Sequence, residues 1–240
     1  KITYYKSNKS LFKLFTSGST GKPKGIEHSS GGYLLYAKLT CIQQFGMNSN
    51  SVVLTASDAG WINGHTNALY GPLSLGATTI LLESPMILLD KILLKKILKL
   101  NVTILYLPVT LIRLMKALFN KVKFNYKSLK TLGSMGEPLA PSVGKWFAVS
   151  FNLQRKAIIN TYFQTETGGI IASPKYTESA KQVPHGSVGK IINKKIKFFK
   201  LNKNKNEIIV KSSWPGCMKN VINGKQEWNK YWNQKGYFRM

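Results

Sequence analysis

Ten residues near the start of the chain, Thr16 to Gly25, combine the groups that a polyphosphate ligand needs. Three glycines free the backbone to adopt conformations that side chains would forbid. Backbone N–H groups and hydroxyls donate hydrogen bonds to phosphate oxygens, and ammonium groups neutralise their charge. The sequence therefore predicts an ATP-binding loop made of Thr16, Ser17, Gly18, Ser19, Thr20, Gly21, Lys22 and Lys24.

This loop differs from the P-loop, whose sequence G-x-x-x-x-G-K-[ST] ends in a hydroxyl that ligates magnesium. Here Pro23 follows the Gly21–Lys22 pair, and the spacing from Gly18 to Gly21 is too short. A flexible glycine-serine linker is the structural alternative. A linker would need neither the Pro-Lys-Gly ending nor the apolar run Leu11–Phe15, which is typical of a strand that leads into the loop.

A second motif surrounds an aromatic side chain with glycines. Asp58–His65 reads Asp-Ala-Gly-Trp-Ile-Asn-Gly-His, and Tyr70–Leu73 reads Tyr-Gly-Pro-Leu. Small neighbours allow a ligand to approach the wall formed by Trp61 closely. The alternative is a tryptophan of the core, with His65 packed on a helix.

A glycine-rich turn, Gly133–Pro138, follows a short strand predicted at Leu129–Leu132. Open α/β sheets bind ligands at the carboxyl ends of their strands. The turn also carries Glu137, in a chain with only nine acidic residues. We interpret it as part of a ligand site, with an ordinary strand-to-helix turn as the alternative.

The fourth motif, Asn160–Gly169, places an aromatic pair beside hydroxyls and a carboxylate. Tyr162 and Phe163 are suited to sandwich a purine or to form a pocket wall. Thr165 is able to donate a hydrogen bond to a phosphate. Glu166 supplies the hard oxygen ligands that Mg²⁺ prefers.

Together these motifs resemble the adenylate-forming superfamily and, within it, the short-chain acyl-CoA synthetases, the acetyl-CoA synthetases above all. Ser17–Gly25 matches the superfamily's phosphate-loop signature throughout, and Gln164–Gly168 matches its Gln-Thr-Glu-Thr-Gly motif. The Gly-Trp-x-x-Gly-His run from Gly60 and the segment Lys211–Gly216 resemble the acetyl-CoA synthetase pattern. We interpret Lys211–Gly216 as mainly structural.

The resemblance implies a role for each predicted site residue. The β- and γ-phosphates would be held by Ser17, Thr20 and Lys22 or Lys24, and the α-phosphate by Thr165. The predicted catalytic residues are Lys22, Thr165 and Glu166, of which Glu166 would hold Mg²⁺. The adenine and AMP contacts would be Gly136, Glu137, Pro138, Asn160, Thr161, Tyr162, Phe163 and Gln164. The acyl pocket would be shaped by Trp61, Ile62, Met135 and Phe163, and Asn63 would approach coenzyme A.

Two positions of the acyl pocket depart from the family's pattern. Phe163 stands where the family usually has a tryptophan, and Met135 stands where this branch commonly has a smaller valine. One methylene in a hydrophobic pocket changes binding by only about 1–3 kcal/mol. We expect acetate as the substrate, and propionate stays open.

The resemblance implies a ligase that works in two half-reactions. A small carboxylate attacks the α-phosphate of Mg·ATP to give acyl-adenylate and pyrophosphate, and coenzyme A then displaces AMP. Catalysis would rest on positioning and charge neutralisation, because the sequence has neither a Ser-His-Asp order nor a cysteine-histidine metal cluster. The expected partners are the small molecules acetate, ATP and coenzyme A, with no specific nucleic acid and no membrane; the oligomeric state stays open.

The elements that must position these residues alternate between apolar runs and amphipathic segments, which is typical of an α/β fold with a mainly parallel sheet. Strands are predicted at 11–15, 51–56, 78–83, 102–107, 129–132 and 157–163, and helices at 31–45, 62–75, 87–100, 111–119 and 141–151, the last with Pro141 at its start. Short β runs follow at 189–192, 195–201 and 207–211. We predict an α/β nucleotide- and acyl-binding portion over 1–173 and a smaller β-rich lobe of the same domain over 174–240.

The net charge of +26 raises the alternative of a basic nucleic-acid-binding protein. Of the 35 basic residues, however, only three are arginine. Proteins that recognise bases and phosphates favour arginine, because its planar guanidinium donates two parallel hydrogen bonds. The 32 lysines accompany 18 asparagines, a combination that A-rich codons would produce. Binding to DNA that survives moderate salt would favour the alternative.

Two cysteines in a chain with no C-x-x-C spacing favour a reducing, cytoplasmic setting, with a nucleus or an organelle left open. The resemblance covers the middle of a family member. Because the chain begins with Lys1 and ends before the family's Thr-Gly-Asp and mobile C-terminal domain, we expect a partial sequence that makes no acyl-CoA alone. A non-catalytic truncated protein is the alternative.

Overall fold

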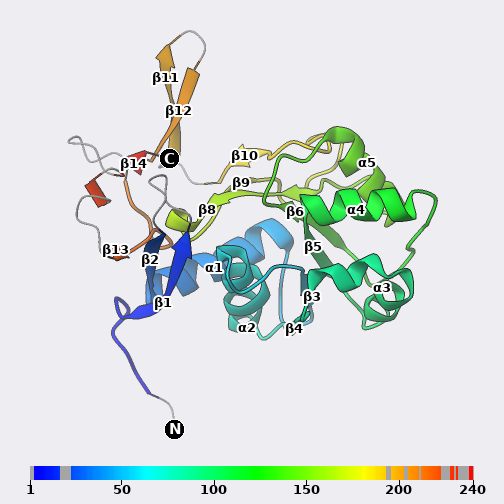
Figure 1. The fold of residues 1–240 in the computed structure, drawn as a ribbon, viewed down its shortest axis with the longest axis horizontal. Helices are drawn as coiled ribbons and strands as arrows, with labels where there is room; N and C mark the ends of the chain where they lie inside the picture. The colour runs from blue at the N-terminus through cyan, green and yellow to red at the C-terminus, as the bar shows by residue number, and fades with distance from the viewer. Residues whose placement is uncertain are drawn as a thin grey trace.

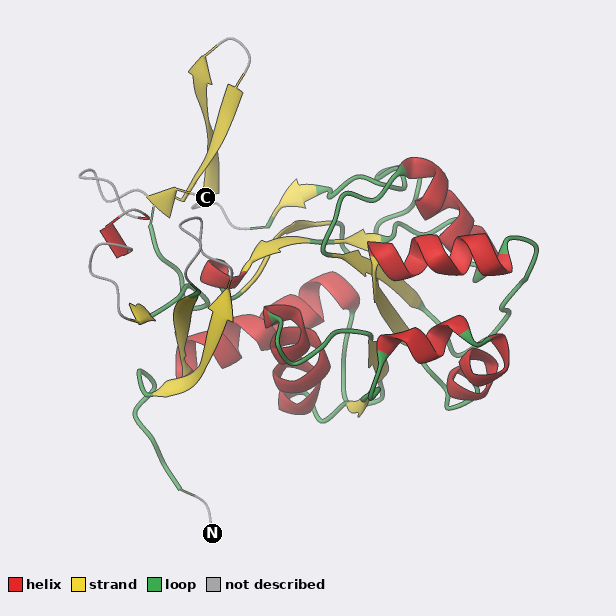
Figure 2. Cartoon of the chain, in the orientation of Figure 1, coloured by secondary structure: helices red, strands yellow, loops and turns green. Residues whose placement is uncertain are grey.

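The computed structural model describes residues 3–16, 23–192, 196–202, 205–210, 212–222, 228–229, 231 and 238–239. Figure 1 shows the path of the chain, and Figure 2 separates helices, strands and loops by colour. Helices gather around a central sheet, while smaller antiparallel sheets lie toward the end that holds both termini. The predicted α/β class is confirmed.

The central sheet has five strands in the order β4-β3-β5-β6-β7, and every neighbouring pair runs parallel. In chain order the strands are β3 (Val52–Thr55), β4 (Thr78–Ile80), β5 (Ile104–Pro108), β6 (Thr131–Met135) and β7 (Ile159–Asn160). The near-continuous apolar sequences of β3 and β5 follow from burial on both faces, because helices cover a parallel sheet on each side.

Alternate residues of these strands enter two different cores. Leu54 and Leu105 pack with the helices α3 (Lys91–Leu98), α4 (Val109–Phe119) and α5 (Pro141–Ser150). Val53 and Tyr106 point to the opposite face and pack against α1 (Ser30–Phe45). This alternation is the period-2 geometry of a strand, so one short run builds two hydrophobic layers.

Three antiparallel sheets complete the part of the chain that the structure describes. The hairpin of β1 (Ser10–Thr16) and β2 (Lys24–Ser29) is joined by β13 (Asn220–Ile222). The strands β8 (Tyr162–Gln164), β9 (Gly169–Ser173) and β10 (Lys190–Ile191) form the second sheet. The third contains β11 (Ile196–Asn202), β12 (Lys205–Val210) and β14 (Phe238–Arg239), and its β11–β12 hairpin projects from the body (Figure 1).

Several predicted elements have different bounds in the structure. The single helix predicted at 87–100 is a 3₁₀ turn, η2 (Pro85–Leu89), followed by α3, because the Asp90 carboxylate caps a new helix start by accepting from the N–H groups of Ile92 and Leu93. The helix predicted at 62–75 is a π-helical segment, η1 (Gly64–Tyr70), that continues into α2 (Gly71–Ser74).

Three further differences concern the predicted site. Gly133, Ser134 and Met135 belong to β6 and not to a turn, so the turn begins at Gly136. The strand predicted at 157–163 is divided into β7 and β8, which belong to different sheets. The strands β2 and β9 were not predicted from the sequence.

Strands from the segment after residue 173 pair with strands that precede it, since β10 pairs with β9 and β13 with β2. The two-part division at residue 173 stays a prediction. Across the part of the chain that the structure describes, no helix has the length and apolarity required to cross a membrane.

Candidate functional site

The β1–β2 hairpin holds the two ends of the predicted phosphate loop. Thr16 is the last residue of β1 and pairs in register with Lys24, the first residue of β2. Ser17, Gly18, Ser19, Thr20, Gly21 and Lys22 lie outside the described residues. The hairpin therefore fixes where this loop leaves and re-enters the sheet.

Lys24 lies against the predicted metal-binding carboxylate. Its Nζ atom is 3.6 Å from Oε1 of Glu166. Both side chains are largely buried, with 16% of Lys24 and 11% of Glu166 exposed. Burial limits screening by water, so this attraction is stronger than that of a surface pair.

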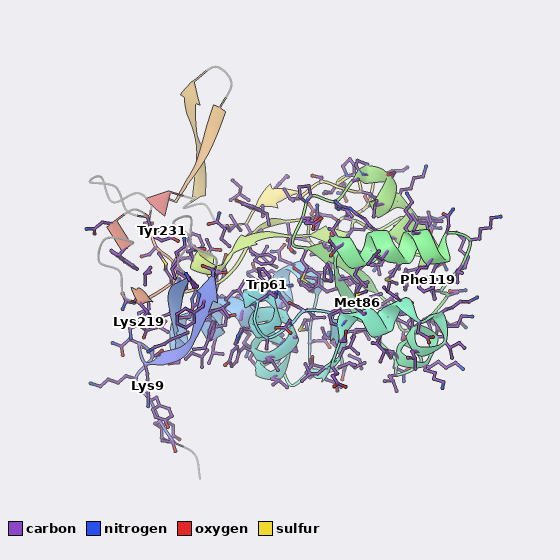
Figure 3. The ribbon with its side chains drawn as sticks, in the orientation of Figure 1. Lys9, Trp61, Met86, Phe119, Lys219 and Tyr231 are labelled. Atoms are coloured by element: carbon purple, nitrogen blue, oxygen red, sulfur yellow. The ribbon has the colours of Figure 1, made fainter. Side chains whose placement is uncertain are left out.

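A third group, Tyr231, joins this pair from a distant part of the sequence. Its hydroxyl donates to Oε1 of Glu166 at 2.7 Å and accepts a short hydrogen bond from Nζ of Lys24. The lysine also lies 4.7 Å from the centre of the tyrosine ring. Figure 3 shows Tyr231 on the side of the molecule that carries the β1–β2 hairpin.

The hydroxyl group of Thr167 stabilises the turn that carries Glu166. The 3₁₀ turn η3 (Thr165–Thr167) follows β8 directly, and Oγ1 of Thr167 accepts from the N–H of Gln164 at 3.1 Å and donates to its carbonyl at 2.8 Å. Gly168 ends the turn with a φ of 68°, in the left-handed region that favours glycine.

His28 of β2 forms a hydrogen bond to the backbone of the same turn. Its Nε2 lies 2.8 Å from the carbonyl oxygen of Thr165. A carbonyl only accepts, so Nε2 carries the proton. Burial lowers the pKa of His28 from its ordinary value to about 4, which keeps the ring neutral near pH 7.

The segment 212–222 packs on the other side of this turn. The N–H of Met218 donates to the carbonyl of Glu166 at 2.8 Å. A side-chain carbon at Gly168 would lie 1.7 Å from the carbonyl oxygen of Gly216. Trp214 is buried beside Tyr36. The region interpreted as structural thus supports the Glu166 turn directly, although Lys211 itself lies outside the described residues.

The predicted adenine turn lies at the end of β6. Gly136 has a φ of 87°, and the space beside its Cα is open. Glu137 forms an ion pair with Arg113 of α4, with Oε2 and Nη1 2.9 Å apart. The carbonyl of Pro138 accepts a longer bond, 3.4 Å, from the same guanidinium. Arg113 therefore contacts two of the three residues of this turn that were predicted near adenine.

Two residues that were predicted near adenine, Asn160 of β7 and Thr161 directly after it, are bonded to β6. Oγ of Ser134 donates to Oδ1 of Asn160 at 3.0 Å, and Oγ1 of Thr161 donates to the carbonyl of Ser134 at 3.1 Å. Asn160 and Thr161 are buried. Tyr162 is partly buried and packs with the cluster that contains Trp214.

Three of the four predicted acyl-pocket residues come together. Phe163 packs both against the cluster that contains Met135 and against the one that contains Ile62. Trp61 differs from them, because 69% of its surface is exposed (Figure 3). The structure thus brings an apolar wall together at the ends of β6 and β8 and leaves the tryptophan at the surface.

Asn63, predicted to approach coenzyme A, is buried beside this wall. Its amide contacts the sulfur of Met135 and accepts from the amide of Asn67, both at short range. A direct contact with coenzyme A would require one of these bonds to exchange. The role of Asn63 stays a prediction.

Comparison with known proteins places this arrangement in a family. A family profile described as AMP-binding enzyme matches residues 4–209, which include the hairpin, the central sheet and the Glu166 turn. The chain belongs to this family. The family resemblance predicted from the motifs is confirmed.

Relatives within the AMP-binding enzyme family share one name. The chain is 45% identical over 167 residues to the acetyl-coenzyme A synthetase of Helicobacter pylori strain P12, covering 68% of this chain and 25% of that protein. It is 39% identical over 231 residues to acetyl-coenzyme A synthetase 1 of Debaryomyces hansenii, covering 89% of this chain and 33% of that protein. The chain thus spans a quarter to a third of these relatives.

A solved structure supports the fold. The crystal structure of the anthranilate CoA ligase AuaEII in complex with anthranoyl-AMP matches with a TM-score of 0.81, covering 98% of this chain and 44% of that chain. The sequence identity is 18%, so this likeness concerns the AMP-binding enzyme fold alone.

The donor set of this AMP-binding enzyme suits a magnesium ion shared with phosphates. Within the described ranges, no cluster of three or more His, Cys, Asp or Glu side chains is present to enclose a metal. Mg²⁺ keeps several waters and is bound by one or two carboxylates together with substrate phosphates. Glu166, which lies in η3 beside Lys24 at one end of the predicted phosphate loop, fits that requirement.

Among the residues that sequence reasoning missed, four contact the predicted Glu166 and adenine turns. His28, Arg113, Met218 and Tyr231 each bond to a predicted site residue. Only Arg113 carried a signal, as one of three arginines in a lysine-rich chain. The others have no local motif, because their partners lie far away in the sequence.

Proposed function

We propose that this chain binds Mg·ATP and a short-chain carboxylate, acetate foremost, in the formation of an acyl-adenylate and then an acyl-CoA. The name that its relatives share supports acetate and coenzyme A as substrates. Since the chain spans only part of those relatives, the complete reaction is a proposal about the protein that contains it.

One observation carries the proposal. Lys24, at the end of the predicted phosphate loop, and Glu166, the predicted metal ligand, are 142 positions apart in the sequence and 3.6 Å apart in space. A triphosphate needs a cation for its oxygens and a carboxylate for its metal within a few ångströms of each other. An arrangement of this kind has no evident use in a flexible linker.

In the proposed reaction, the carboxylate oxygen of the substrate attacks the α-phosphorus, and the bond from that phosphorus to pyrophosphate breaks. Lys24 neutralises charge on the phosphates, and the Thr165 hydroxyl donates to the α-phosphate. The sulfur of coenzyme A then forms a bond to the acyl carbon, and AMP leaves. These residues act by position and charge, which is the main contribution of proteins to phosphoryl chemistry.

Glu166 would hold Mg²⁺, which when bound neutralises the triphosphate and orients it for attack. His28 and Met218 hold the backbone on either side of this carboxylate, through the carbonyls of Thr165 and Glu166. A carboxylate on a backbone fixed in this way needs little reorganisation when the metal arrives.

The acyl group would contact the wall of Ile62, Met135 and Phe163. These side chains are apolar and at least partly buried, which suits a methyl group and offers no partner for a second charge. We propose acetate as the preferred acid, because the family's relatives carry that substrate in their name.

The direct test is calorimetric titration of the chain with ATP in excess Mg²⁺. We expect Lys24→Ala and Glu166→Gln each to weaken binding by about tenfold or more, since charge-assisted hydrogen bonds in buried sites have this value. The matched control is Lys219→Ala. Lys219 also faces a carboxylate, that of Glu27 at 3.3 Å, but its side chain is 40% exposed.

The control variant should bind ATP within about twofold of the parent chain, because exposed ion pairs contribute little. A parent chain that does not bind ATP would refute the nucleotide site. Equal weakening by Lys24→Ala and Lys219→Ala would reduce the site to general attraction by a basic surface.

A further inference from the structure

Tyr231 lies where the phosphate loop and the metal-binding turn meet, yet no motif pointed to it. Its hydroxyl bonds to Glu166, 65 positions away, and to Lys24, 207 positions away. We propose that Tyr231 is a positioning residue, whose hydroxyl keeps Lys24 and Glu166 apart and so leaves the carboxylate available to Mg²⁺. This inference rests on the proposed function.

The chemistry of the three groups fixes the direction of both hydrogen bonds. An ammonium only donates, an ionised carboxylate only accepts, and a phenol does both. The proton of the tyrosine therefore points to Glu166, and a lone pair of its oxygen faces Lys24. The hydroxyl is the only one of the three that satisfies both charges at once.

The distances agree with a hydroxyl that separates two charges. Oε1 of Glu166 is 2.7 Å from the tyrosine oxygen and 3.6 Å from Nζ of Lys24. A direct charge-assisted bond between ammonium and carboxylate is about 2.7–2.9 Å long. Without the hydroxyl, this largely buried pair would close to that distance, and the ammonium would occupy the position on the carboxylate that a metal needs.

The ring of Tyr231 is anchored by packing, which makes it suitable for positioning. It lies with Trp228 against the buried cluster that contains Ile26 and Met218. Ile26 is two residues from Lys24, and Met218 bonds the Glu166 backbone. The same cluster thus holds the tyrosine and both segments that its hydroxyl joins.

The test measures the Mg²⁺ concentration that gives half-maximal ATP binding by the chain, with ATP binding in excess EDTA as the second readout. Tyr231→Phe removes one oxygen and keeps the ring. We expect its magnesium requirement to rise by about tenfold, the value of one hydrogen bond to a charged group. Binding of metal-free ATP should change less than twofold. A merely structural role would change both readouts together.

The matched control is Tyr36→Phe, which also removes one hydroxyl from a hydrogen bond, the one to the carbonyl of Ile170 at 2.8 Å. We expect a lower melting temperature and an unchanged magnesium requirement. The double variant Lys24→Met/Tyr231→Phe supplies a second measurement. Compared with Lys24→Met alone, its magnesium requirement should change less than twofold, because no ammonium is left to close on Glu166.

The outcomes separate the two claims. A parent chain that binds ATP with magnesium dependence, beside a Tyr231→Phe variant that behaves in the same way, would overturn the role of Tyr231 and leave the proposed function standing. An equal effect of Tyr231→Phe with and without Lys24 would also overturn it. A parent chain that binds no ATP in either condition would overturn both.

Discussion

The two ends of the candidate site are built from different interactions. The end predicted to hold the phosphates, called the phosphate side, joins Lys24, Glu166 and Tyr231, charged and polar groups from three distant segments, through a few hydrogen bonds. The end predicted to hold the acyl group, called the acyl side, joins Met135 and Phe163 by apolar packing on strands that the sheets already hold in place. The geometry of the phosphate side therefore depends on individual hydrogen-bonding atoms, and that of the acyl side on the total volume of its side chains.

This contrast has an energetic reason. A buried polar group that loses its partner retains its full desolvation cost, whereas an apolar wall can adjust to a substitution of similar size. We expect substitutions on the phosphate side to act through geometry and charge, and substitutions on the acyl side to change which ligand fits.

The largest effect on stability is expected at Gly168, where the backbone of the phosphate side approaches the backbone of Gly216 most closely. Gly168→Ala should lower the free energy of unfolding by about 4 kcal/mol, from the left-handed backbone and the forced displacement of a neighbouring chain. The new methyl group would lie 1.7 Å from the carbonyl oxygen of Gly216. Urea unfolding monitored by tryptophan fluorescence measures the change.

Gly136→Ala is the matched control at the adenine turn. Gly136 also has a positive φ, 87°, but no atom lies within 4 Å of the added carbon. We expect a loss of about 1–2 kcal/mol from the backbone alone. Equal losses of unfolding free energy at the two glycines would mean that the close contact between Gly168 and Gly216 contributes nothing to the effect of the substitution.

The next largest effect is the loss of stability at low pH, which we assign to His28. Burial lowers the pKa of His28 to about 4, below its ordinary value of 6.5, so the unfolded chain binds this proton more readily. The free energy of unfolding should therefore fall by about 3 kcal/mol as the pH drops from 6.5 to 4, and the loss is complete below that window. Urea unfolding at a series of pH values measures it.

His28→Gln keeps a donor for the Thr165 carbonyl and removes the titration, so most of this slope should vanish. His65 is the comparison near the acyl side, where burial lowers the pKa of a ring stacked on Phe12. His65→Gln should change the slope less, because His65 is only partly buried. An unchanged acid slope in His28→Gln would disprove the burial argument.

On the acyl side we expect a smaller change that affects selectivity. Phe163→Trp should shift the ratio of affinities for the ethyl and propyl esters of AMP by about tenfold in favour of ethyl, since a methylene in a filled pocket has this value. Competition against a fluorescent AMP analogue measures both affinities.

Leu118→Trp adds the same ring on the exposed face of α4 and should leave the ratio unchanged. If Phe163→Trp weakens both esters equally, Phe163 does not face the acyl group. The comparison between a polar phosphate side and a volume-dependent acyl side would then lose its second half.

The smallest effect is expected at a polar contact outside the phosphate side. Arg113 and Glu137 are about half exposed, at 49% and 41%, so this ion pair should contribute at most about 1 kcal/mol. Arg113→Gln should weaken AMP binding by about twofold to threefold, with Arg155→Gln as the charge-matched control. A tenfold loss would show that the adenine turn depends on single atoms as strongly as Glu166 does.

Much of the fold could be predicted because its signals are local. The strand at Leu11–Phe15, the helix at 31–45 and the buried strand at 102–107 follow from apolar periodicity, and the structure has β1, α1 and β5 at those places. Prediction failed where one side chain redirects the chain, as Asp90 does when it starts α3. The strands β2 and β9 carry little periodic signal of their own and form through pairing.

The candidate site divides in the same way. Residue types and spacing predict the phosphate loop, the glycine turn and the Gln-Thr-Glu-Thr-Gly motif as nucleotide-binding parts, because each has a composition that few other uses require. The contacts of Glu166 with Lys24 and Tyr231 could not be found in this way. A hydrogen bond between segments up to 207 positions apart does not affect the spacing of residue types within either segment.

The amino-acid sequence by itself determined the chemistry of this protein: hydroxyls, lysines and one carboxylate in motifs typical of a family that binds AMP. Only the tertiary structure decided which of these groups meet, and that His28, Met218 and Tyr231 hold them. The reason is physical, because the donors and acceptors of a motif are written locally, whereas their distances depend on how a five-stranded sheet and a hairpin pack together.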